Sequence, residues 1–154
     1  HPQTMGDHKT LGLIYDRLNE TEKAIYHFEK IVTAKPQGAD KYDSLGHSFS
    51  ILGRLYSTAG KYGKSIERYQ QALDYFSKKL GEKHPKLAYY HDALAFSHQL
   101  NKDILQAIFH NEKAFELDIG KLRTEPAEIA NRLNLIGDLY SNNSEYNKAL
   151  INVA

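Results

Sequence analysis

The chain has 154 residues, of which 41% are hydrophobic and 25% charged, a balance typical of a globular protein rather than of a disordered chain. Twenty basic residues oppose 19 acidic ones, and the resulting net charge of +1 argues against a nucleic-acid partner, which normally selects a basic stripe. The absence of cysteine excludes disulfides, thiolate nucleophiles and cysteine-ligated zinc. No apolar run approaches the roughly 20 residues of a membrane span, so we expect no membrane partner and a cytoplasmic location.

Apolar residues three and four apart predict helices along the whole chain. In chain order, the predicted helices cover residues 3–18, 21–35, 40–59, 61–80, 85–101, 103–121, 125–142 and 144–154. The polar or glycine-containing segments LNET, TAGKY, LNKD and SNNSEY predict a turn within each successive pair. Because the last predicted helix stops within an apolar pattern, we expect the chain to be a fragment of a longer protein.

One five-residue pattern recurs at intervals of 41, 42 and 42 residues. Its four copies are Leu11-Gly12-Leu13-Ile14-Tyr15, Leu52-Gly53-Arg54-Leu55-Tyr56, Leu94-Ala95-Phe96-Ser97-His98 and Ile136-Gly137-Asp138-Leu139-Tyr140. The period predicts a single array over residues 1–154, with repeats at about 5–45, 46–87, 88–129 and 130–154, the last one truncated. A glycine inside a helix costs up to about 1 kcal/mol relative to alanine, so its recurrence predicts close packing of the second helix of each pair.

These repeats resemble the tetratricopeptide repeat (TPR) family. The family signature is matched in the first copy by Leu11, Gly12, Tyr15, Ala24, Phe28 and Pro36. The period of about 42 and the segment KKLGEKHPKLAYYHDALA are similar to the long repeats of kinesin light chains and nephrocystin-type proteins. The resemblance implies an all-α, right-handed superhelical array of antiparallel helix pairs that acts as a protein–protein interaction scaffold.

No motif in the chain supports catalysis or cofactor binding. The eight histidines include no His-Glu-x-x-His, and His98 fills a tyrosine position of the repeat, where we expect it to pack. No phosphate-binding loop or Gly-x-Ser-x-Gly motif occurs. We therefore expect no enzyme activity, no cofactor and no metal.

The resemblance also implies a concave groove that binds a peptide or a partner segment. Transferred by repeat position, its residues are Lys9, Leu13, His47, Ser50, Arg54, Tyr89, Asp92, Phe96, Asn131, Asn134 and Asp138, accompanied by Asp16, Ser57, Gln99 and Ser141. We predict a peptide of mixed character, with an acidic residue near Arg54, an apolar anchor against Tyr89 and Phe96, and main-chain amides held by Asn131 and Asn134.

Three alternatives remain open at this point. Phe96 could belong to the inter-helix core instead of the groove. The chain could be an oligomerisation or intramolecular regulatory arm of a larger protein, and we expect the uncovered Leu150, Ile151 and Val153 to promote self-association. An RNA-binding helical repeat is a third alternative.

Overall fold

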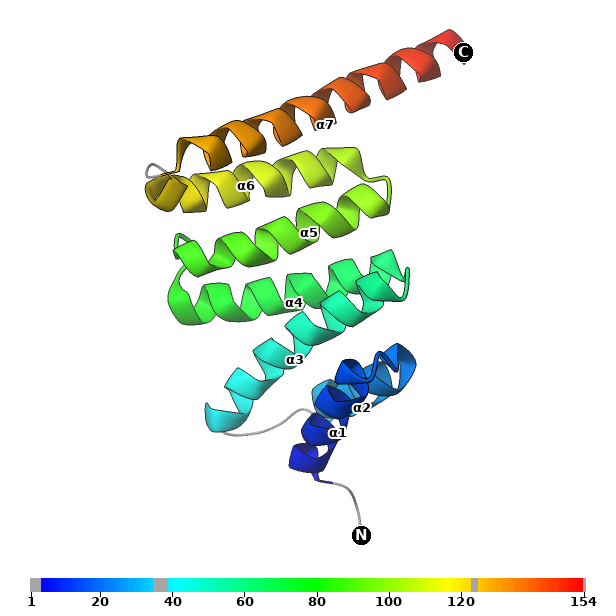
Figure 1. Ribbon diagram of the computed structural model, residues 1–154, viewed down its shortest axis with the longest axis vertical. Helices are drawn as coiled ribbons and strands as arrows, with labels where there is room; N and C mark the ends of the chain where they lie inside the picture. Colours follow the sequence, from blue (N-terminus) through cyan, green and yellow to red (C-terminus); the bar gives the residue numbers. More distant parts are fainter. Residues whose placement is uncertain (1–3, 35–38, 123–124, 154) are drawn as a thin grey trace. The chain divides into compact units, whose positions relative to one another are not determined.

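The computed structural model describes residues 4–34, 39–122 and 125–153. Within these ranges the protein is all-α, with seven α-helices, one 3-10 turn and no strand, which confirms the predicted fold class (Figure 1). The elements are α1 (Met5–Arg17), α2 (Thr21–Thr33), α3 (Ala39–Thr58), α4 (Tyr62–Leu80), η1 (Pro85–Leu87), α5 (Ala88–Leu100), α6 (Ile104–Leu122) and α7 (Pro126–Val153). None of the described helices is long and apolar enough to span a bilayer.

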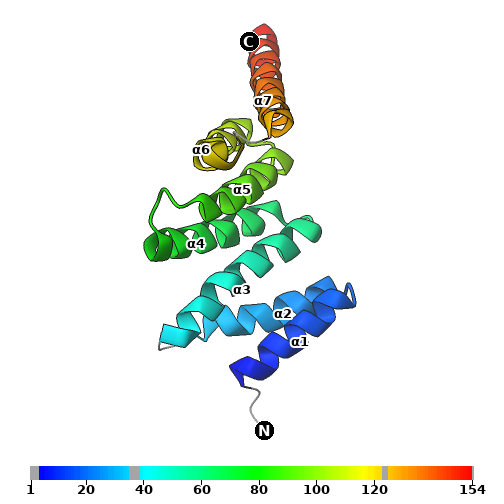
Figure 2. The same ribbon diagram turned by 60° about the vertical axis from the view of Figure 1, so that its left-hand side comes forward.

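The chain divides into two compact units, His1–Lys79 and Leu80–Ala154. In the first unit, α2 packs against α1 and α3, and α3 packs against α4 (Figure 1, Figure 2). In the second unit, α6 packs against both α5 and α7. Each unit therefore contains helices of about two of the predicted repeats.

The turns of the first three helix pairs share one backbone geometry. Each contains a residue with positive φ at the same repeat position: Asn19 at 58°, Gly60 at 72° and Lys102 at 64°. In each turn the next residue donates its backbone N–H to the carbonyl at the end of the five-residue pattern, at 2.8 to 2.9 Å. This bond closes the end of a helix around a left-handed residue, so the sequence period reappears as a repeated backbone conformation.

The fourth copy departs from this pattern. The predicted break at SNNSEY is wrong, because α7 runs for 28 residues through Ser144, the equivalent of Lys102 (Figure 1). The prediction of eight helices is therefore also wrong for the described residues. A left-handed residue costs roughly 1–2 kcal/mol unless it is glycine, and packing of the following helix has to compensate. In α7 the helix continues through Ser144 instead.

The repeated glycines are packing positions in the first unit. A Cβ on Gly12 would lie 2.8 Å from the ring of Phe28, and one on Gly53 would lie 2.7 Å from the ring of Tyr69. Each ring belongs to a residue sixteen positions later, in the second helix of the pair. The expected close approach of the two helices is thus confirmed at both glycines.

At the equivalent positions of the third and fourth copies, the packing between the two helices differs. Ala95 has a Cβ, and the residue sixteen positions later is the smaller Asn111, which is 4% exposed. A Cβ on Gly137 would meet no described heavy atom within 4 Å, so close packing is not found there. The reason is the continuous α7: residue 153, which would cover Gly137, lies further along the same helix.

Candidate functional site

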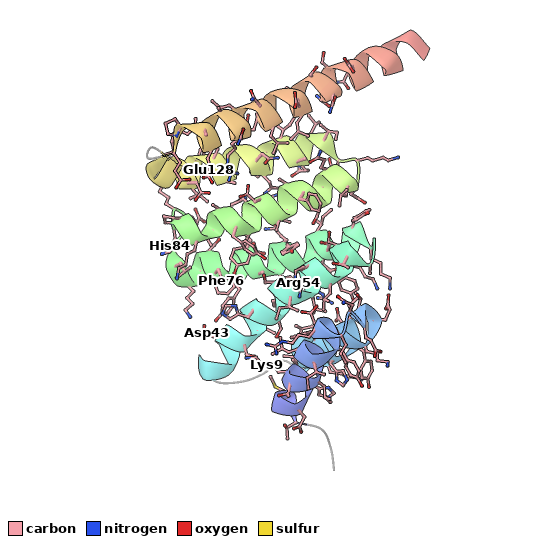
Figure 3. All side chains as sticks on the ribbon, in the orientation of Figure 1. Lys9, Asp43, Arg54, Phe76, His84 and Glu128 are labelled. Carbon is pink, nitrogen blue, oxygen red and sulfur yellow. The ribbon has the colours of Figure 1, made fainter. Side chains whose placement is uncertain are left out.

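A hollow of about 440 Å³ lies within the second unit, where α5 and α7 both pack on α6. Its lining consists of Asp92, Phe96 and Gln99 from α5, Asn111 from α6, and Glu128, Asn131, Arg132 and Leu135 from α7. The lining residues of α5 and of α7 recur at three- and four-residue intervals, so each helix presents one face to the hollow. Figure 3 shows Glu128 near the start of α7.

An ion pair connects the two walls of the hollow. Arg132 on α7 donates from both terminal nitrogens to the carboxylate of Asp92 on α5, with Nη2 3.0 Å from Oδ2. Its Nη2 also lies 3.5 Å from Oδ2 of Asp118 on α6. The hydrogen bonds from Arg132 to Asp92 raise the pKa of the guanidinium above its usual value. A bidentate arginine–carboxylate pair is geometrically specific, so it holds α5 and α7 at a defined separation.

The remaining lining is apolar or neutral. Phe96 and Leu135 are 57% and 41% exposed, which is high for large apolar side chains, and Phe96 therefore does not belong to the inter-helix core. Asn111 is buried and donates its Nδ2 to the carbonyl of Ala107 at 3.0 Å. Asn131 and Gln99 are exposed, so their side-chain amides are accessible in the hollow.

The structure brings together some of the predicted groove residues. Asp92, Phe96 and Asn131 share the hollow, together with Gln99. Tyr89, Asn134 and Asp138 are exposed but do not line it.

Four lining residues were missed by the sequence reasoning. Glu128, Arg132 and Leu135 could have been found by extending the Asn131 position along one helical face. Asn111 lies on a second helix, and its only signal was that it replaces the aromatic residue of the repeat.

The predicted residues of the first unit lie on α1 and α3. Lys9, His47 and Arg54 are exposed, Leu13 is 40% exposed, and Ser50 is half-buried. Arg54 donates a hydrogen bond to Asp16, which connects α3 to α1. An acidic ligand at Arg54 would have to compete with this carboxylate. That all eleven predicted residues serve one groove stays a prediction.

Four of the eight histidines form two equivalent ring pairs, one in each unit. Nδ1 of His8 lies 2.9 Å from Nδ1 of His27, and Nδ1 of His91 lies 2.9 Å from Nδ1 of His110, two repeats later. In each case one nitrogen donates and the other accepts, so the pair holds a single proton between its rings. Among the described residues, no group of three or more histidine or acidic side chains could hold a metal ion.

A third ring stacks on each pair. Tyr15 stacks on His27 with ring centroids 5.5 Å apart, and His98 stacks on His110 at the same distance, which confirms that His98 packs as a tyrosine would. Burial, together with the neighbouring His91 and His98, lowers the pKa of His110 to about 4. The imidazole of His110 is therefore neutral at physiological pH.

Comparison with known families and structures agrees with this architecture. Two models described as tetratricopeptide repeat match residues 10–37 and 44–119. The chain belongs to the tetratricopeptide repeat family, as the repeat pattern predicted. No curated protein sequence matches it.

Two solved structures have a similar fold. BtubC (BKLC) from P. vanneervenii matches with a TM-score of 0.73 at 20% identity, over 96% of this chain and 59% of that one. A protein described as a putative kinesin light chain with nearly identical TPR-like repeats, from Podosopora anserina, matches with a TM-score of 0.70 at 22% identity, over 97% of this chain and 71% of that one. The chain thus spans about three-fifths of the length of BtubC. At these identities the matches show the fold, an α-solenoid.

Proposed function

We propose that the chain is a non-enzymatic protein-interaction scaffold that binds a peptide segment in the hollow between α5 and α7. Tetratricopeptide repeats are generally protein-interaction scaffolds, and the family is typically non-enzymatic. Helical-repeat proteins offer concave surfaces of this kind to extended or helical segments. The hollow has an exposed aromatic side chain and side-chain amides, which such a segment can contact.

The observation that carries the proposal is the exposure of Phe96. A phenylalanine that is 57% exposed inside a concave, amide-lined surface leaves apolar area in contact with water. Aromatic side chains are frequent anchors of interfaces, where truncation of an anchor can cost about 2 kcal/mol or more. Asn131 and Gln99 can hold the main chain of a ligand beside this anchor.

Selection from a random displayed-peptide library tests the proposal. Peptides enriched on the immobilised chain should be lost on Phe96→Ala and retained on Leu105→Ala. Leu105 is a matched control because it is 65% exposed on α6 and does not line the hollow. Equal enrichment on both variants would contradict the proposal, as would a library that yields no binder.

Self-association is the second candidate, and the open face of α7 favours it. Leu133 is 52% exposed, and no described residue covers Gly137 four residues later on the same face. Light scattering should then show a mass that rises with concentration, and Leu133→Lys should return the chain to a monomer. A constant monomer mass in the unchanged chain would contradict this candidate.

A further inference from the structure

We propose that the hollow between α5 and α7 selects a peptide in which an apolar side chain is flanked by lysine or arginine, and that it disfavours acidic peptides. This inference rests on the proposed function and specifies the ligand. It follows from the balance of charge in the hollow and from which of its charged groups are already paired.

The charged lining residues are two carboxylates and one guanidinium. Asp92 and Glu128 carry negative charge and Arg132 positive charge, so the lining has a formal charge of −1. The side chain of Arg132 is 18% exposed, and its guanidinium already contacts Asp92 and Asp118. An acidic ligand would have to displace Asp92 from a bidentate pair while approaching a second carboxylate.

Glu128 is the charged group that a ligand can reach. It is exposed in the first turn of α7, and among the described residues its carboxylate takes part in no hydrogen bond or ion pair within bonding distance. Its charge does act on the guanidinium of Arg132, four residues later, and contributes to the raised pKa of that group. A lysine or arginine of the ligand would place its charge beside this carboxylate at the rim of the hollow. Charge complementarity of this kind contributes mainly to specificity and to the rate of association.

The apolar part of the ligand has a defined place as well. Phe96 and Leu135 provide exposed apolar area on opposite walls of the hollow. The face of Phe96 also attracts a cation through its ring quadrupole, so a basic residue next to the apolar anchor is favoured twice. Asn111 donates one Nδ2 hydrogen to Ala107, so its second Nδ2 hydrogen and its oxygen are the groups left for a ligand.

Fluorescence anisotropy with two short labelled peptides tests the inference on the full chain. One peptide alternates leucine with lysine, and the other has glutamate in place of every lysine. At low salt the basic peptide should bind roughly fivefold or more tightly than the acidic one. The difference should shrink at about 1 M salt, where the Debye length is near 3 Å.

Substitutions test whether the preference for the basic peptide depends on Glu128. Glu128→Lys should abolish or reverse the preference, and Glu128→Gln should weaken it without placing a cation in the first turn of α7. Glu145→Lys is the matched control, because Glu145 is exposed on α7 outside the hollow and the substitution changes net charge equally. It should leave the preference unchanged, whereas Phe96→Ala should weaken binding of both peptides.

The possible failures differ. If both peptides bind equally well, or the acidic one binds better, and Phe96→Ala weakens both, the charge inference is wrong while the proposed function stands. A preference that Glu145→Lys abolishes as fully as Glu128→Lys does would also overturn the inference, because net charge alone would then explain it. If neither peptide binds, the proposed function and the inference fail together.

Discussion

Gly53 lies where α3 meets α4, and its lack of a side chain makes room for the ring of Tyr69. In Gly53→Ala the new Cβ would lie 2.7 Å from Cγ and 2.8 Å from both Cδ atoms of that ring. Tyr69 is 6% exposed, so its ring cannot swing freely into solvent. The two backbones are also connected here, because Ser65 donates its hydroxyl hydrogen to the carbonyl of Gly53 at 2.7 Å.

Two opposing terms set the magnitude of the effect. Alanine is favoured over glycine in a helix by up to about 1 kcal/mol. Adding a methyl group to a packed interface costs typically about 1–3 kcal/mol, because helices or rings must shift. The contact involves three atoms of one buried ring, so we expect packing to dominate and Gly53→Ala to lower the free energy of unfolding by about 1–2 kcal/mol.

Gly137→Ala is the matched control. Gly137 occupies the same repeat position in a helix, but no described atom lies within 4 Å of its would-be Cβ. Only the higher helix propensity of alanine relative to glycine then matters, so this substitution should raise the free energy of unfolding by about 0.5–1 kcal/mol. Urea denaturation followed by far-ultraviolet circular dichroism measures both variants. The reasoning is refuted if Gly53→Ala is neutral or stabilising, or if the two variants change stability in the same direction.

Two further predictions concern buried polar groups. The pKa of His110 is about 4 in the folded protein against 6.5 normally, so between these values the unfolded chain binds a proton that the folded chain excludes. The contribution of His110 to the free energy of unfolding is therefore fully present above about pH 6.5 and is lost as the pH drops towards 4, by about 2 kcal/mol between pH 7.5 and 5 at about 1.4 kcal/mol per pH unit. Urea denaturation at both pH values should show a smaller loss for His110→Gln than for the unchanged chain, and an equal loss in both proteins would contradict the assignment. In the first unit, Tyr56 donates its hydroxyl hydrogen to Glu29 at 2.8 Å, and burial with this bond raises the pKa of Tyr56 to about 12. Tyr56→Phe should lower the free energy of unfolding by about 1–2 kcal/mol. Tyr140→Phe removes the equivalent but exposed hydrogen bond to Glu112, so it should change the free energy of unfolding by less than about 0.5 kcal/mol. Similar losses in both variants would show that burial does not set the cost of removing the bond.

The fold class, the helix pairs of the first three copies and the role of two glycines could all be predicted from the sequence. Helical periodicity and a period of 41 or 42 residues are local properties of the chain, so they can be read without coordinates. Gly12 and Gly53 were identified as packing positions because a residue that is costly in a helix recurred at one repeat position, and the same reasoning failed at Gly137. Phe96, Asp92 and Asn131 were assigned to one groove through the resemblance to the tetratricopeptide repeat family, and all three line the hollow.

The features that depend on contacts between distant segments could be determined only from the folded structure. The turn predicted at Ser144 has the same repeat position as the turns at Asn19 and Lys102, yet α7 continues through Ser144. A left-handed residue has a steric cost, which packing of the following helix onto its partner has to compensate. The pairing of Arg132 with Asp92 brings together side chains forty residues apart. This contact decides whether the guanidinium of Arg132 is available to a ligand. The sequence alone does not show it, because a charge pattern along the chain does not indicate which carboxylate lies within hydrogen-bonding distance.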